Sequence, residues 1–217
     1  KSGTMPFDYF SAFVSINMLA DIESLDLASE AGCRAVFVGF ESVNPESLKA
    51  MNKHLNHDRF PPHRYAELVR NAQRRKMMVT AEMVVGSDAD DEEVLRVTEE
   101  YLKTANFDIL RMYVLQPFPG TPLFKRMQAE GRLYLKNFPE DWKKTRERFV
   151  VGVHYELKNL SAERVLEWTR KVGLNFYRPH KILWRTARFL LMTRDPKLAL
   201  LFGSVSYKGR KWYGGLT

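Results

Sequence analysis

The sequence predicts an α/β fold built on a parallel sheet, and three observations support this fold class. Strand-like apolar runs alternate with helical patterns four times between residues 10 and 131, which is typical of βαβ units with right-handed crossovers. One run, 35–40, is nearly all apolar, as expected for a parallel strand covered on both faces. Each run ends at a polar or glycine-rich corner that opens a helix, where parallel α/β proteins place their chemistry. Four units make an incomplete barrel or a small open sheet.

Each expected element has a local reason in the sequence. Gly32 and Gly131 follow helical patterns in the position where a helix often ends on a left-handed residue. Pro45 lies in a first helical turn, and Asp90 or Asp91 could cap the helix that follows the third strand. In chain order we expect strand 10–17, helix 21–31, strand 35–40, a helix from Pro45, a loop over 52–59, a helix opened by Pro61 and Pro62, strand 77–85, a helix through Ala105, strand 109–115 and helix 123–130.

The pattern changes after residue 131. Trp142 and the apolar residues 149–151 come first, and a helix over 161–177, a second helix from Pro179 and a third from Asp195 follow. We therefore divide the chain into residues 1–135, which hold the βα units, and residues 136–217, a mainly helical extension.

Composition limits the class of protein. The 217 residues are 45% hydrophobic and 28% charged, which is ordinary for a globular domain, and no apolar run reaches the length of about 18 residues that a membrane-spanning helix needs. The chain starts at Lys1 without a signal-peptide core, and Met5 is internal. We expect the chain to be cut from a longer protein.

Cys33 is the single cysteine, so an internal disulfide and a cysteine-based metal cluster are both excluded within this chain. It follows a helical pattern and precedes an apolar strand, which favours a small buried hydrophobic residue over a reactive thiol. Sparse use of cysteine agrees with a cytoplasmic location.

Two carboxylates stand out. Glu41 follows a buried strand and would point from its carboxyl end into the mouth of a barrel, and Glu82 lies inside an apolar strand. Because a buried carboxylate without a partner is unfavourable, both are functional candidates. For Glu82 the alternatives are an ion pair with Lys53 or Arg111, or a place at a solvent-facing edge. The two acids could serve as general acid and base in a barrel hydrolase or lyase, or bind hydroxyl or amino groups.

Other patterns favour structural roles. The acidic run 88–93 lacks the ligand pattern of a calcium loop and favours a solvated, capped helix start. His54, His57 and His63 show no metal-ligand spacing, and no P-loop, GxGxxG or GxSxG motif is present.

Three segments together resemble radical S-adenosylmethionine enzymes, most closely the branch with an N-terminal cobalamin-binding domain. They are VGFESVNPESLK…MNK at 38–53, VVGSDADD at 84–91, and QPFPGTPLF at 116–124 with EGRL at 130–133. The similarity covers roughly residues 7–180, and the branch includes bacteriochlorophyll cyclases, hopanoid-modifying enzymes and methyltransferases. The family fold is a six-stranded partial (β/α) barrel of the TIM type, of which these four units would be the third to sixth.

The resemblance implies cofactors as well as a fold. The family binds S-adenosylmethionine and a 4Fe–4S cluster, and this branch uses cobalamin. The cluster is held by a Cys-x-x-x-Cys-x-x-Cys motif, which is absent from this chain. The cluster ligands would therefore lie outside it, and the chain alone would be inactive.

The resemblance also assigns residues to the cosubstrate. Glu41 would contact its amino-acid or ribose portion, Lys53 its carboxylate and Glu82 its ribose. Ser15 or Asn17 would act similarly on the preceding strand, and Gln116 would end the last strand near the adenine. Relatives commonly have threonine at the position of Gln116 and a second glycine near Ala81, so this chain departs from the family pattern on the adenine side. The resemblance thus implies six residues that bind cofactor: Ser15, Asn17, Glu41, Lys53, Glu82 and Gln116.

The positive charge lies in the last forty residues. Residues 178–217 hold nine Lys or Arg and one acid, Asp195, whereas residues 1–177 hold 25 of each sign. An amphipathic surface that meets anionic lipid or a lipid-like substrate is one interpretation, and helices packed on the barrel with basic faces in water are the favoured one. Nucleic-acid binding is disfavoured because no recognised motif accompanies the charge. A non-catalytic remnant that binds a partner through this tail is a further alternative.

Overall fold

The computed structural model describes residues 9–135, 137, 139–141 and 152–215. Its centre is a four-stranded sheet in the order β1-β2-β3-β4. All neighbouring strands are parallel, which confirms the predicted α/β class. The strands are β1 (Phe10–Val14), β2 (Cys33–Glu41), β3 (Met78–Val85) and β4 (Ile109–Val114).

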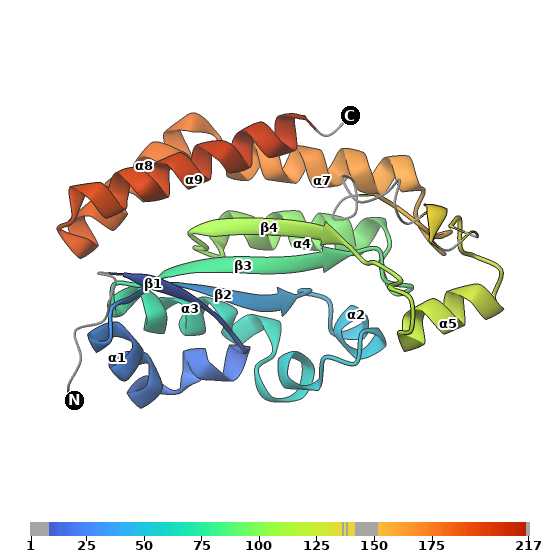
Figure 1. Ribbon diagram of the computed structural model, residues 1–217, viewed down its shortest axis with the longest axis horizontal. Helices are drawn as coiled ribbons and strands as arrows, with labels where there is room; N and C mark the ends of the chain where they lie inside the picture. Colours follow the sequence, from blue (N-terminus) through green and yellow to red (C-terminus); the bar gives the residue numbers. More distant parts are fainter. Residues whose placement is uncertain (1–8, 136, 138, 142–151, 216–217) are drawn as a thin grey trace.

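Helices connect the strands and continue the chain beyond the sheet (Figure 1). The connecting helices are α1 (Ile22–Glu30), α2 (Pro45–Ala50), α3 (Tyr65–Arg74) and α4 (Glu92–Thr104), and α5 (Pro122–Ala129) follows β4. Short 3-10 helices cover Ile16–Ala20 and Pro62–Arg64, and a π-helical turn covers Leu55–Arg59. The extension forms α7 (Ala162–Phe176), α8 (Pro179–Thr193) and α9 (Pro196–Gly214).

Alternation along β2 separates the two faces of the sheet. Val36, Val38 and Phe40 are fully buried in the main hydrophobic core, to which α1, α3 and α4 contribute. The opposite face carries Phe37 and Glu41, which are only partly buried. The nearly all-apolar run 35–40 predicted a strand that is buried on both faces. Within the described residues, the face that carries Phe37 and Glu41 is only partly covered, so the run predicted more burial than this face has. The sheet therefore presents one packed face and one accessible face.

The free edge of β4 is closed by tyrosine hydroxyls from the extension. The Leu110 amide donates to Tyr177 Oη at 3.0 Å, and this hydroxyl donates to the Leu110 carbonyl at 2.9 Å. The Met112 amide donates to Tyr213 Oη at 2.9 Å. An edge strand otherwise offers unpaired backbone groups to other chains. These hydroxyls satisfy such groups and fix the ends of α7 and α9 against the sheet.

The structure agrees with most predicted element positions, shortens the first strand, adds a helical turn to one loop and decides between the two predicted caps of α4. The first strand ends at Val14 rather than residue 17, because the chain turns into a 3-10 helix at Ile16. Asp91, not Asp90, caps α4 by accepting a hydrogen bond from the Val94 amide at 2.9 Å. The expected loop over 52–59 contains the π-helical turn. Trp142 and residues 149–151 lie outside the described residues.

Asp90 has a different role from the predicted cap. Its buried carboxylate accepts hydrogen bonds from the Gly86 amide at 2.7 Å and the Ser87 amide at 2.9 Å. The Ser47 hydroxyl donates to its other oxygen. Asp90 therefore holds the turn after β3 closed and ties it to α2.

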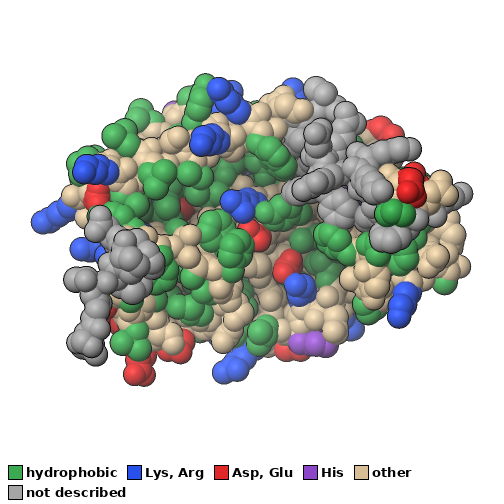
Figure 2. Space-filling view, viewed as in Figure 1, with side chains coloured by type: hydrophobic (Ala, Val, Ile, Leu, Met, Phe, Trp, Pro, Cys, Tyr) green, Lys and Arg blue, Asp and Glu red, His purple; other side chains and the backbone are tan. Residues whose placement is uncertain are grey.

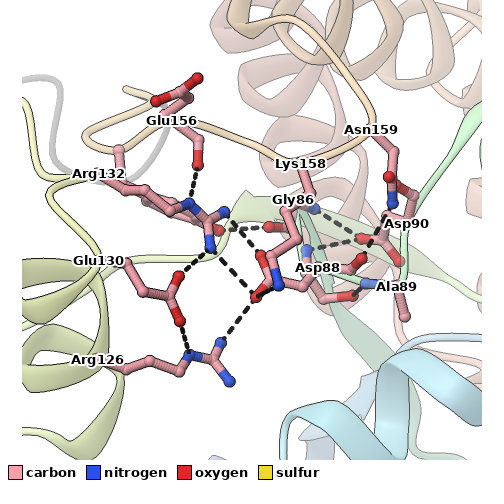
Figure 3. Close-up of polar contacts among 12 residues, drawn as sticks. Gly86, Asp88, Ala89, Asp90, Arg126, Glu130, Arg132, Glu156, Lys158 and Asn159 are labelled. Atoms are coloured by element: carbon pink, nitrogen blue, oxygen red, sulfur yellow. Dashed lines mark hydrogen bonds and ion pairs between the residues drawn. The ribbon is translucent and has the colours of Figure 1, made fainter.

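Asp88, in the same turn, forms a cluster with charged side chains from later in the chain (Figure 3). Arg132 Nη2 lies 2.7 Å from Asp88 Oδ1, and Arg126 and Lys158 lie within 3.4 Å of Asp88 Oδ2. Glu130 accepts a second hydrogen bond from Arg132 at 2.7 Å. We refer to these five residues as the Asp88 cluster. It joins the turn after β3 to the end of α5 and to the segment that leads into α7.

The Asp88 cluster settles how the acidic run 88–93 is used. The described residues contain no group of three or more His, Cys, Asp or Glu side chains that could hold a metal ion. Partial burial by itself raises the pKa of Asp88, but the hydrogen bond from Arg132 and the nearby positive charges outweigh it and hold the pKa below its ordinary value. Within this run, Asp91 caps α4, Asp90 holds the turn after β3 through backbone hydrogen bonds, and Asp88 forms the ion-pair cluster.

Candidate functional site

A cleft of about 610 Å³ opens at the carboxyl end of β1 and β2, a volume in the range of small-molecule sites. Four of the six predicted cofactor-binding residues line it: Ser15, Glu41, Lys53 and Glu82. Phe13 and Phe37 supply apolar walls, and their rings stack 4.6 Å apart. Figure 2 shows acidic and basic side chains next to one another in the middle of a largely hydrophobic face. The cleft thus combines fixed charges with apolar surface.

Glu41 occupies an unusual backbone conformation at the corner that ends β2. Its φ is 65°, in the left-handed region that side chains other than glycine and asparagine seldom adopt. The pairing with β3 shifts register between Gly39 and Glu41. The Glu41 carboxylate folds back over Gly39, where an added Cβ would lie 2.6 Å from Oε1. Such conformations cost about 1–3 kcal/mol and cluster at functional sites.

Lys53 completes this corner. Its Nζ lies 2.6 Å from Glu41 Oε1, and the side chains of Lys53 and Glu41 are 43% and 16% exposed. The pair is reached from the cleft, so a ligand could meet both charges. The family resemblance had implied that both residues serve one ligand, and the structure brings the two side chains into contact.

Two buried residues that sequence reasoning missed hold the corner in place. Asn56 Nδ2 donates to the carbonyls of Gly39 at 2.9 Å and Phe40 at 3.1 Å. Tyr65 Oη lies 3.0 Å from the Phe40 carbonyl and 3.1 Å from the Ser42 carbonyl. The only signals in the sequence were a polar residue in a loop and a tyrosine on the apolar face of the next helix, and neither indicates its partner.

Glu82 meets Arg111 across neighbouring strands, as one of its predicted alternatives allowed. The two residues are paired in the β3–β4 register, and Arg111 Nη1 donates to Glu82 Oε1 at 3.4 Å. The guanidinium also lies 4.9 Å from the centre of the Phe37 ring. The Glu82 side chain lines the cleft and is 23% exposed, and that of Arg111 is 44% exposed. Glu82 also interacts with the side chain of Tyr113 on β4.

Ser15, Asn17 and Gln116 have different surroundings. Ser15 lines the cleft and donates a hydrogen bond to Asn17 Oδ1, whereas Asn17 is absent from the cleft lining. Gln116 Nε2 donates to the Gly152 carbonyl at 2.7 Å, and its buried Oε1 has no partner in the described part of the chain. Asn17 therefore contacts Ser15, and Gln116 contacts the carbonyl of Gly152. Neither Asn17 nor Gln116 lines the cleft.

The cleft residues suit the polar groups of S-adenosylmethionine but not an iron–sulfur cluster. Carboxylates that line a cleft can accept hydrogen bonds from ribose hydroxyls and an amino group, and a lysine can bind a carboxylate. Burial raises the pKa of the Cys33 thiol, and a cluster needs several thiolates. Cluster ligands are thus not supplied by the residues that the structure describes.

The chain is similar to curated methyltransferases, although no protein-family model matches it. It is 31% identical over 178 residues to bacteriochlorophyllide d C-12(1)-methyltransferase of Chlorobaculum tepidum, covering 81% of this chain and 36% of that protein. It is 33% identical over 119 residues to hopanoid C-2 methylase of Rhodopseudomonas palustris, covering 55% of this chain and 22% of that protein. The chain therefore spans about a third or less of the length of these two relatives.

Solved structures of longer proteins also match. The radical S-adenosylmethionine methyltransferase TsrM from Kitasatospora setae aligns with a TM-score of 0.49 at 22% identity, over 55% of this chain and 22% of that chain. The cobalamin-dependent radical enzyme OxsB aligns with a TM-score of 0.45 at 12% identity, over 94% of this chain and 34% of that chain. The sequence matches to the curated methyltransferases agree with the family expected from the motifs. The chain fits a fragment of a radical S-adenosylmethionine enzyme of the cobalamin-dependent branch.

Proposed function

We propose that this chain is part of a radical S-adenosylmethionine methyltransferase and that its sheet is the later part of a partial (β/α) barrel of the TIM type. The observation that carries the proposal is the convergence of Ser15, Glu41, Lys53 and Glu82 on one cleft at the carboxyl end of the sheet. The relatives' names indicate an organic ring system as substrate, such as a bacteriochlorophyllide or a hopanoid. We propose a small organic or lipid-like substrate of this kind.

Within the cleft, each charged residue has a role in holding the cosubstrate. Lys53 binds its carboxylate, Glu41 accepts hydrogen bonds from its amino group or ribose, and Glu82 accepts hydrogen bonds from ribose hydroxyls. The cofactors supply the chemistry when bound: S-adenosylmethionine, a 4Fe–4S cluster whose ligands lie outside this chain, and cobalamin. This chain contributes orientation and electrostatics, and by itself it is inactive.

A hydrolase or lyase that uses Glu41 and Glu82 as acid and base remains the second candidate. We favour the first because the closely matching curated relatives are methyltransferases. A direct measurement of cosubstrate binding separates the two candidates, since the second needs no S-adenosylmethionine.

Glu82→Gln in the full-length, reconstituted protein is expected to weaken S-adenosylmethionine binding about tenfold, because a hydrogen bond to a charged group contributes about 1.5–3 kcal/mol. Isothermal titration calorimetry measures the dissociation constant without requiring turnover. Glu99→Gln is the matched control, since the Glu99 side chain is also 23% exposed and pairs with a single cation, Lys171, at 3.0 Å. Full retained affinity in Glu82→Gln would show that Glu82 does not bind the cosubstrate.

We also propose peripheral contact of α8 and α9 with an anionic membrane. No helix among the described residues is long and apolar enough to cross a bilayer, but the two helices expose large apolar side chains. These are Leu183, Trp184, Leu191, Leu200 and Leu201, with exposed fractions from 56% to 79%. Exposed apolar residues combined with Lys and Arg are typical of helices that lie in the membrane interface.

Replacing Leu191 and Leu200 together with serine is expected to weaken the affinity for anionic vesicles, measured by flotation, about a hundredfold, because each buried apolar side chain contributes about 1.5 kcal/mol or more. Val97→Ser is the control, since Val97 is a 41% exposed apolar residue on α4. Equal flotation of the double variant and the wild type would favour the interpretation in which the basic helix faces only meet water.

A further inference from the structure

A second cavity, of about 330 Å³, lies at the opposite end of the sheet from the cosubstrate cleft. Part of its lining comes from places where strands begin: Tyr9 precedes β1, Arg34 is the second residue of β2 and Lys76 precedes β3. The turn between α8 and α9, with Arg194 and Asp195, completes the lining. Figure 1 shows this turn on the side of the sheet where the strands start.

Among the residues that the structure describes, the lining of the cavity has more positive than negative side chains. None of its three cations, Arg34, Lys76 and Arg194, forms a salt bridge with any carboxylate of the described residues. Arg34 Nη1 donates to the carbonyls of Ser29 at 2.9 Å and Cys33 at 2.7 Å, which fixes the guanidinium and leaves its other N–H groups for a ligand.

The one acid of the cavity is already engaged. Asp195 accepts a hydrogen bond from the Tyr9 hydroxyl and another from the Leu198 amide, at 3.0 Å, as the cap of α9. The hydrogen bond from Tyr9 is the main reason why the pKa of Asp195 is below its ordinary value. Asp195 thus shapes the turn, and three cations against this one carboxylate leave the lining with a net charge of 3 − 1 = +2.

Two of the cations, Lys76 and Arg194, have a left-handed backbone conformation that lysine and arginine seldom adopt. Lys76 has a φ of 62° and Arg194 a φ of 56°, and each follows the end of a helix. Glycine or asparagine is the usual residue in this left-handed position. Among the described non-glycine residues with positive φ, the others are Asn52, Asn106 and Glu41, and Glu41 lies in the cosubstrate cleft. A strained residue with a functional side chain therefore marks each of the two cavities.

We propose that this second cavity binds a phosphate group. An arginine guanidinium matches phosphate oxygens in a two-pronged geometry, and lysine is an effective point charge for the same group. The phosphate can come from the head group of an anionic lipid or from a small phosphorylated molecule. Leu191, Leu200 and Leu201 are exposed on the two helices joined by this turn, which favours the lipid. The site is separate from the cosubstrate cleft and does not depend on the role proposed for that cleft.

Arg194→Gly and Lys76→Gly test the proposal without disturbing the fold, because glycine adopts a positive φ without steric penalty. Each variant is expected to weaken phosphate binding about tenfold, whereas the thermal midpoint stays the same or rises. Asn106→Gly is the matched control: Asn106 also has a positive φ, of 58°, but it contributes no charge to the cavity. Binding is measured by calorimetry with inorganic phosphate and glycerol phosphate.

A second arm identifies the source of the phosphate. Sedimentation with phosphatidylglycerol–phosphatidylcholine vesicles is compared with sedimentation with phosphatidylcholine alone. Binding to the anionic vesicles that both glycine variants weaken assigns the site to a lipid head group, and binding of the soluble phosphates alone assigns it to a small molecule. Absence of binding in both arms, or wild-type affinity in both glycine variants, overturns the proposal.

Discussion

Replacing Asp88 with alanine is expected to lower the free energy of unfolding by about 2–3 kcal/mol, because the largely buried Arg132 loses one of its two acidic partners. The Arg132 side chain is only 10% exposed and would keep Glu130 as its remaining acidic partner. For a chain of this size, the thermal midpoint should fall by about 5–10 °C. Thermal unfolding followed by circular dichroism measures both quantities.

A solvent-exposed ion pair provides the comparison. Glu93 and Arg96 lie 2.6 Å apart with side chains 63% and 62% exposed. Since surface pairs contribute about 0–1 kcal/mol, Glu93→Ala should change the thermal midpoint little. If Asp88→Ala and Glu93→Ala shifted the midpoint equally, the Asp88 cluster would not fasten the extension to the sheet.

The pH dependence of Asp88→Asn gives an independent check on the same cluster. The pKa of Asp88 is lower in the folded protein than its ordinary value of 3.8. A carboxyl group of this kind stabilises the fold above its unfolded pKa, and the contribution is lost as the pH falls through the folded value. The difference in midpoint between the wild type and Asp88→Asn should stay constant from about pH 7 to pH 5 and shrink below about pH 4.

The two neighbouring acids Asp90 and Asp91 show what a sequence can predict about local structure. The sequence placed a cap at one of them, and Asp91 is that cap because its partner, Val94, is only three residues away. The role of Asp90 depends partly on Ser47, which comes from a different helix 43 residues earlier. A hydrogen bond between residues a few positions apart can be predicted from their spacing in the sequence. A hydrogen bond between distant segments can be predicted only when the fold is known.

The same distinction holds at the candidate site. Glu41 and Glu82 could be singled out because charges at strand ends and inside apolar strands are unusual, whereas Lys53 became a candidate only through the family resemblance. Choosing Arg111 rather than Lys53 as the partner of Glu82 needed the β3–β4 register. Asn56 contacts carbonyls 16 and 17 residues away, and its residue type alone gives no reason to expect this. The hydrophobic periodicity of the sequence likewise does not predict the shape of the Glu41 corner or its left-handed backbone conformation.

Gly39 is the residue through which the shape of this corner can be tested most directly. Gly39→Ala in the full-length, reconstituted protein is expected to weaken S-adenosylmethionine binding about 100-fold, because it disturbs two charge-assisted contacts of the proposed site. The new Cβ would lie 2.6 Å from Glu41 Oε1, at the far end of a flexible side chain. The Glu41 carboxylate would therefore move and leave Lys53, while the backbone of β2 stays in place. Calorimetry should show the loss of affinity at an unchanged thermal midpoint.

A matched glycine and a double-mutant cycle make this result specific to Glu41. Gly214→Ala is the control, because a Cβ added there meets no atom within 4 Å. If Gly39→Ala acts only by displacing Glu41, it should weaken binding no further in a protein that already carries Glu41→Ala, since residues that act through one contact are not additive. Additive effects of the two substitutions would contradict this account, and wild-type affinity in Gly39→Ala would show that the position of the Glu41 carboxylate over Gly39 is not needed for the cosubstrate.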